Sequence, residues 1–100
     1  MGTATWTSKK IGSLGNLRMR IGDVTMSSSY ATNGDTLTAG AVEMNEILVA
    51  EFPETFTGGY ELAYDRTNSK VKAYVITTGV EAANTTNLSG VTSRAIFWGY

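Results

Sequence analysis

The sequence predicts an all-β fold, an antiparallel β-sandwich that is jelly-roll-like. Three observations lead to this prediction: a hairpin that can be paired residue by residue, six or seven short β-forming segments separated by turn residues, and a composition that is 42% hydrophobic and 10% aromatic. The chain has 100 residues, which is enough for one modest core. We therefore expect a single β domain over residues 1–100.

Residues 58–76 (GGYELAYDRTNSKVKAYVI) predict an antiparallel hairpin with one defined register. Pairing Asp65 with Lys70 across the turn 66–69 creates one apolar face and one polar face with opposite charges in reach. A shift of one residue would turn Lys70 and Lys72 toward the core, so we expect the register to be firmly set. The apolar face then consists of Tyr60, Leu62, Tyr64, Val71, Ala73 and Val75.

The N-terminal quarter contains one clear strand and one segment with two interpretations. Residues 16–26 predict a strand, because apolar side chains alternate with arginines, and the parity of the apolar residues changes after Gly22. Such a change at a glycine is typical of a bulge or a bend. Residues 3–11 form a first strand, or else residues 1–15 form an extended N-terminal arm with Trp6 as its one large anchor.

The middle of the chain contains a strand, 46–52, with apolar residues on both faces. This pattern predicts a central strand or one covered by a second sheet. Pro53 ends it, because proline cannot donate a ladder hydrogen bond. Turn residues and alternation predict the remaining segments: loops over 27–35 and 79–90, a short helical turn over 38–46 and a last strand over 91–100.

The composition excludes several function classes. The chain has no cysteine and no histidine, which removes disulfides, thiolate nucleophiles, zinc sites and the usual general base. We therefore expect no enzyme, no metal and no cofactor. A net charge of −1 gives no indication of nucleic-acid binding. No apolar run approaches the roughly 20 residues of a membrane helix, so no membrane partner is expected.

Short motifs that superficially suggest chemistry are predicted to be ordinary turns or surface residues. Residues 12–16 (GSLGN) lack the GK[ST] ending of a phosphate loop. Residues 65–69 lack the glycine and the distal glutamate of a calcium loop. Glu51 and Glu54 have no motif that would make them a glycosidase pair, and Ser27–Ser29 have no histidine to activate them.

The charges are distributed unevenly along the chain. Lys9, Lys10, Arg18 and Arg20 precede every acid, whereas residues 21–64 contain seven acids and no base. In one interpretation these stretches are neighbouring strands that neutralise each other within the monomer. In the other, the basic stretch of one copy meets the acidic stretch of the next, and charge complementarity steers assembly.

Three segments carry a resemblance to a known family. They are residues 29–38 (SYATNGDTLT), residues 60–74 (YELAYDRTNSKVKAY) and residues 84–94 (NTTNLSGVTSR). In this order they resemble segments of small virion proteins of tailed bacteriophages, similar to capsid cement or decoration proteins. The resemblance implies a structural protein, made in the host cytoplasm, that binds the major capsid protein on the capsid exterior and stabilises the head. It also implies a homo-oligomer, a trimer or a dimer.

Two contact surfaces are predicted for such a protein. One comprises Trp6, Lys9, Lys10, Arg18 and Arg20, and the other comprises Trp98 and Tyr100, which are costly to leave in water. A tail or neck adaptor, or a fibre component, would share the fold and composition. A carbohydrate-binding module is the other alternative, and it would need its tryptophans on one exposed face.

Overall fold

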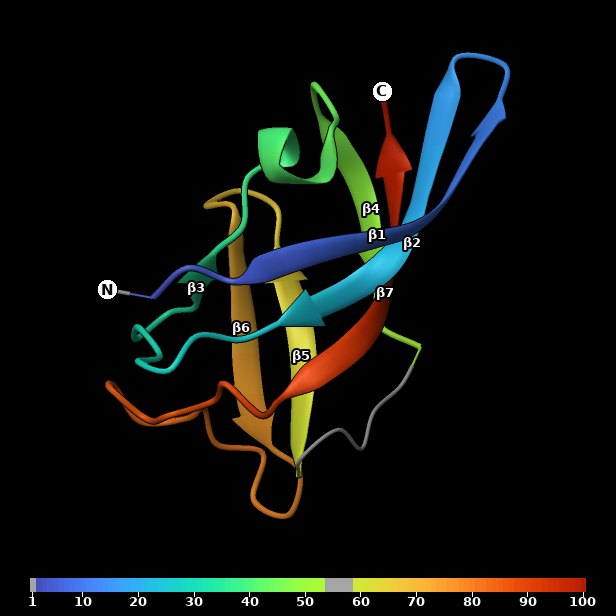
Figure 1. Ribbon diagram of the computed structural model, residues 1–100. Helices are drawn as coiled ribbons and strands as arrows, with labels where there is room; N and C mark the ends of the chain where they lie inside the picture. Colours follow the sequence, from blue (N-terminus) through green and yellow to red (C-terminus); the bar gives the residue numbers. More distant parts are fainter. Residues whose placement is uncertain (1, 54–58) are drawn as a thin grey trace.

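The computed structural model describes residues 2–53 and 59–100, and within them it contains seven strands and one short 3-10 helix (Figure 1). No helix in these two ranges is long or apolar enough to span a bilayer. Glu54, for which a surface position was predicted, lies outside the described residues. The elements are β1 (Thr5–Leu14), β2 (Leu17–Thr25), β3 (Asp35–Thr36), η1 (Ala39–Val42), β4 (Ile47–Glu51), β5 (Tyr60–Asp65), β6 (Lys70–Val75) and β7 (Thr92–Gly99).

The strands form two antiparallel sheets, one of four strands in the order β1-β2-β7-β4 and one of three in the order β3-β6-β5. Figure 1 shows the two sheets as layers whose strands cross at a steep angle. The predicted all-β sandwich is therefore confirmed. The described strands number seven, in sheets of four and three, whereas a full jelly roll has eight strands.

The core lies between the two sheets and extends under the loops that close one end. Phe97 on β7 is fully buried and meets the ring of Tyr64 on β5 edge to face, with centroids 5.6 Å apart. Tyr30, Leu37 and Leu88 fill the core from loops. Together these contacts bury the apolar inner face of each sheet, which supplies the main stabilisation of a sandwich.

The hairpin β5–β6 has the predicted register throughout, from Tyr60 opposite Val75 to Asp65 opposite Lys70. Other predictions along the chain are confirmed as well. A 3-10 helix lies within residues 38–46, the segments 27–35 and 79–90 are largely loops, and β7 occupies the predicted last strand. These segments carry strong local signals, namely alternation, turn residues and a long polar stretch.

Two predictions about strand position are wrong. β4 is an edge strand, and its Leu48 and Val49 are 38% and 49% exposed, so it is neither central nor covered on both faces. In β2 the positions of Arg20, Gly22 and Val24 all lie on the core side, so the strand itself has no bulge at Gly22. The irregularity lies in the partner strand, where the β1–β2 register shifts between Ser8 and Lys10.

Candidate interaction surfaces

The hairpin β1–β2 extends beyond the sandwich (Figure 1). Residues Thr5–Leu14 form a strand of the four-stranded sheet and not a free N-terminal arm. The hairpin closes with the two-residue turn Gly15-Asn16, in which Gly15 has φ +63°, as the first position of a type II′ turn requires. The predicted turn over residues 12–16 is thus confirmed at its end, and no phosphate-binding helix follows it.

A bulge in β1 decides which side chains point outward. The pairing passes from Ser8 opposite Gly22 to Lys10 opposite Ile21, which leaves Lys9 as the extra residue. One extra residue reverses the face on which every later side chain of the strand lies. Lys10 therefore lies on the face of the sheet turned away from the core.

The residues of the predicted basic contact do not all lie together in the structure. Lys9, Lys10 and Arg18 are exposed on the projecting hairpin. Two apolar side chains, Ile11 and Leu14, accompany them and are 64% and 73% exposed. Lys10 and Leu14 lie on the outer face of the hairpin, whereas Ile11 and Arg18 lie on the other face. We call these five residues together the hairpin surface, which thus includes both faces of the projecting hairpin.

Trp6 and Arg20 are not part of this surface. Trp6 lies on the inner face of the sheet, with its ring edge to face with Phe97 at 5.2 Å and close over Gly22. Arg20 is buried on the same face, where its Nη2 donates to the carbonyl of Glu43 at 3.4 Å and its Nε lies 4.0 Å from the Glu43 carboxylate. Both side chains of this predicted contact face the core side of the sheet.

Trp98 and Tyr100, the second predicted contact, lie on the outer face of the four-stranded sheet. Trp98 is half-buried beside Met19 of β2 and Val49 of β4. Tyr100 is 47% exposed, and its hydroxyl donates to Glu46 at 2.9 Å, which is the main reason why the pKa of Tyr100 is raised. These two aromatic residues are therefore accessible to a partner.

The sequence-based prediction missed that this outer face as a whole is apolar. Met19 pairs with Trp98, Ile21 pairs with Ile96, and Val49 borders Trp98 from the other side. The signal was present as apolar residues on both faces of β4 and β7, but it was assigned to burial under a second sheet. We use the name outer face for the apolar set Leu14, Leu17, Met19, Ile21, Val49, Ile96, Trp98 and Tyr100.

The charge distribution follows neither interpretation in full. Within the described residues, Arg20 meets Glu43 and Arg94 meets Asp23 at 2.7 Å, so part of the charge is paired inside the monomer. In residues 2–53 and 59–100 the structure records no ion pair for Lys9, Lys10 or Arg18. The hairpin surface thus retains a net positive charge.

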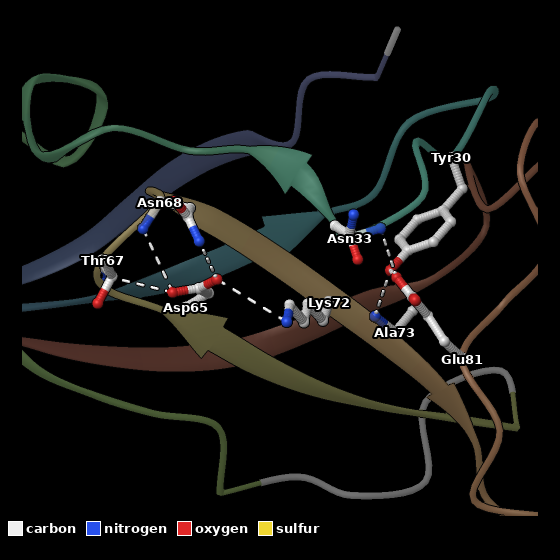
Figure 2. Close-up of polar contacts among 8 residues, drawn as sticks. All are labelled: Tyr30, Asn33, Asp65, Thr67, Asn68, Lys72, Ala73 and Glu81. Atoms are coloured by element: carbon white, nitrogen blue, oxygen red, sulfur yellow. Dashed lines mark hydrogen bonds and ion pairs between the residues drawn. The ribbon is translucent and has the colours of Figure 1, made fainter.

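The three segments of the family resemblance converge on Tyr30, and Figure 2 shows its hydroxyl with Ala73 of the second segment and with Glu81, which precedes the third. The Tyr30 ring is fully buried, its hydroxyl donates to Glu81 at 2.6 Å, and the same hydroxyl accepts the backbone N–H of Ala73 at 3.1 Å. The backbone of Tyr30 also exchanges hydrogen bonds with Thr85 and Thr86. These contacts join the segments into one end of the sandwich, which gives them a structural role.

A polar groove of about 600 Å³ borders this network. In it, Asp65 accepts hydrogen bonds from Thr67 and Asn68 of its own turn and lies 3.8 Å from the Lys72 ammonium, and Figure 2 shows these contacts. The Asn68 side chain is the main cause of a lowered Asp65 pKa. Lys70 donates to Thr36 at 3.1 Å. We assign no ligand to the groove, which is lined by Thr32, Asn33, Asp65, Asn68, Lys70 and Lys72.

Changing Tyr30 to phenylalanine should destabilise the protein in a pH-dependent way. Burial, then the hydrogen bond to Glu81, raises the pKa of Tyr30 well above its usual value. The unfolded phenol ionises near pH 10 while the folded one stays neutral, so this contribution to stability is complete below about pH 10 and declines above it. At pH 8 we expect Tyr30→Phe to lose about 1–3 kcal/mol, because Ala73 N–H and Glu81 lose their partner.

Urea denaturation of both proteins at pH 8 and pH 10.5 measures this effect. The difference in the free energy of unfolding between the wild type and Tyr30→Phe should be smaller at the higher pH. If this difference did not depend on pH, the stabilising role assigned to the neutral Tyr30 hydroxyl would be contradicted. Tyr74→Phe, on the opposite face of β6, is the matched control and should change stability by less than about 0.5 kcal/mol.

No catalytic or metal-binding arrangement emerges from the described parts of the chain. Among residues 2–53 and 59–100 there is no group of three or more acidic, histidine or cysteine side chains that could hold a metal ion. Comparison with protein-family models, curated proteins and solved structures finds no match to this chain. The projecting hairpin surface and the outer face are therefore the candidate functional sites.

Proposed function

We propose that this protein is a structural virion protein, a cement or decoration protein that binds the outer surface of a major capsid lattice and stabilises the head. The observation that carries the proposal is the projecting hairpin surface, which combines Lys9, Lys10 and Arg18 with the exposed Ile11 and Leu14. Such a combination suits docking, because apolar side chains provide buried area while rim charges orient the partner.

The rest of the molecule is consistent with a role in binding without chemistry. A sandwich with buried aromatic contacts is a rigid scaffold, and the chain has no cysteine that could be oxidised. The partner in this proposal is an acidic and apolar patch formed where capsid subunits adjoin. Binding should weaken as salt is added, since exposed charges are screened.

The carbohydrate-binding alternative loses its main support. Trp6 lies on the inner face of the four-stranded sheet, whereas Trp98 lies on the outer face. The two tryptophans therefore cannot form one stacking platform for a sugar.

The test is retention of the purified protein on expanded capsids of its source virus, measured by sedimentation at a fixed ratio to the major capsid protein. The triple change of Lys9, Lys10 and Arg18 to serine should reduce occupancy at least about tenfold, since each lost charge contact weakens docking. Arg20 is left unchanged because it is buried. Arg66→Ser, on an exposed turn of the other sheet, is the control.

Unchanged occupancy of the triple variant would refute docking through the hairpin. Retention of the wild type on purified tails but not on heads would replace the capsid proposal with a tail or neck adaptor.

A further inference from the structure

We infer that the outer face is a self-association surface, on which a second copy of this chain packs face to face about a twofold axis parallel to the strands. This inference goes beyond the capsid proposal, because it rests on the pattern of charges and apolar residues across one sheet, although it shares Lys10 and Leu14 with the hairpin surface.

The strand register of the sheet places side chains in rows that run across the strands. In one row Lys10 on β1 lies opposite Ile21 on β2, Ile21 lies opposite Ile96 on β7, and Ile96 lies opposite Glu51 on β4. Lys10 and Glu51 are both exposed. The row thus has a cation at one edge, an anion at the other and apolar side chains between them.

The neighbouring rows have other compositions that tolerate the same reversal. On one side Met19 lies opposite Trp98, and Trp98 lies opposite Val49. On the other side Asp23 on β2 lies opposite Arg94 on β7, and the two form an ion pair at 2.7 Å within the monomer. When two copies face each other with their rows in opposite directions, opposite charges meet and apolar side chains meet.

A twofold axis parallel to the strands places a second copy over the first with the order of its strands reversed. Such an axis places Lys10 over Glu51 of the second copy and Glu51 over its Lys10. It also brings Asp23 near the second copy's Arg94 and stacks the apolar centres on each other. An axis perpendicular to the strands would instead place Lys10 over Lys10, so charge complementarity selects the first arrangement.

The size of the face indicates a small interface. Four strands about 4.8 Å apart, and eight residues of β7 rising about 3.4 Å each, give a face of roughly 500 Å². Burying it on both copies removes roughly 1,000 Å², the lower end of specific interfaces. We therefore expect a dimer with a dissociation constant on the order of micromolar.

Charge exchange between Lys10 and Glu51 tests the pairing, with mass in solution measured by sedimentation equilibrium over a concentration series. Lys10→Glu places two pairs of glutamates in contact, and Glu51→Lys places two pairs of lysines in contact. Each change should raise the dissociation constant at least about tenfold. An equal mixture of the two variants should form a heterodimer, and the double variant K10E/E51K should dimerise like the wild type.

Lys9→Glu and Glu61→Lys make the same changes of charge outside these rows and should leave the dissociation constant within about twofold of the wild type. A wild type that remains monomeric up to millimolar concentration would overturn the inference. So would a dimer that the single charge reversals do not weaken, or one that the exchanged pair does not restore. None of these measurements involves capsids, so they are decided separately from the proposed function.

Discussion

Replacing Phe97 by alanine is expected to lower the free energy of unfolding by about 3–5 kcal/mol. Phe97 is fully buried and makes edge-to-face contacts with Trp6, Phe52 and Tyr64 at centroid distances of 5.2, 6.4 and 5.6 Å. These rings come from β1, from the segment after β4, and from β5 in the other sheet. Loss of the Phe97 ring therefore removes a contact shared by both layers and leaves a cavity between them.

Chemical denaturation measures the loss, and for a domain of this size the melting temperature should fall by more than about 10 °C. Phe97→Leu keeps a branched apolar side chain and should recover at least roughly half of the loss, because cores tolerate apolar residues of similar size. If Phe97→Ala lost less than about 1 kcal/mol, the two sheets would not depend on this contact.

Local patterns predicted the hairpin β5–β6 completely. Six residues on each strand alternate between apolar and polar, and one pairing satisfies both faces. A register shift would bury Lys72, so no competing arrangement is comparable in energy. The prediction succeeded because both strands and the turn between them lie in one continuous segment, so the pairing does not depend on distant strands.

The face of β2 could not be predicted in the same way. Leu17, Met19 and Ile21 suggest an apolar inner face, yet Arg20 is the residue that turns inward and meets Glu43 near η1. The choice of face depends on the bulge at Lys9 and on where the second sheet ends, and neither leaves a signal in β2 itself. For the same reason, the sequence did not show that Trp6 and Arg20 lie on the inner face of the sheet.

The edge position of β4 illustrates a related limit. Apolar residues on both faces usually indicate a strand covered on both sides. Here the second apolar face belongs to the exposed outer face, which Val49 shares with Trp98. A single sequence does not distinguish side chains buried under a second sheet from apolar side chains that are exposed in the monomer and available to a partner, since both patterns are apolar.

Asp35 is expected to be as important to stability as an apolar core residue. Its side chain is fully buried, with one carboxylate oxygen accepting the N–H of Ser27 at 2.9 Å and the other accepting the N–H of Ala31 at 3.1 Å. Gly2 passes so close that a Cβ there would collide with the carboxylate of Asp35. The acid thus joins the N-terminal segment, the loop after β2 and the start of β3.

Asp35→Ala should therefore cost about 2–5 kcal/mol, because two buried N–H groups lose their acceptor and each costs about 1–3 kcal/mol. Asp35→Asn should also be destabilised, since its amide has one acceptor oxygen and turns an N–H₂ group toward a backbone donor. Urea denaturation compares both with Glu61→Ala, an exposed acid whose loss should cost less than about 0.5 kcal/mol. If Asp35→Asn were as stable as the wild type, one acceptor oxygen would suffice, and the second carboxylate oxygen would not be needed to hold these three segments together.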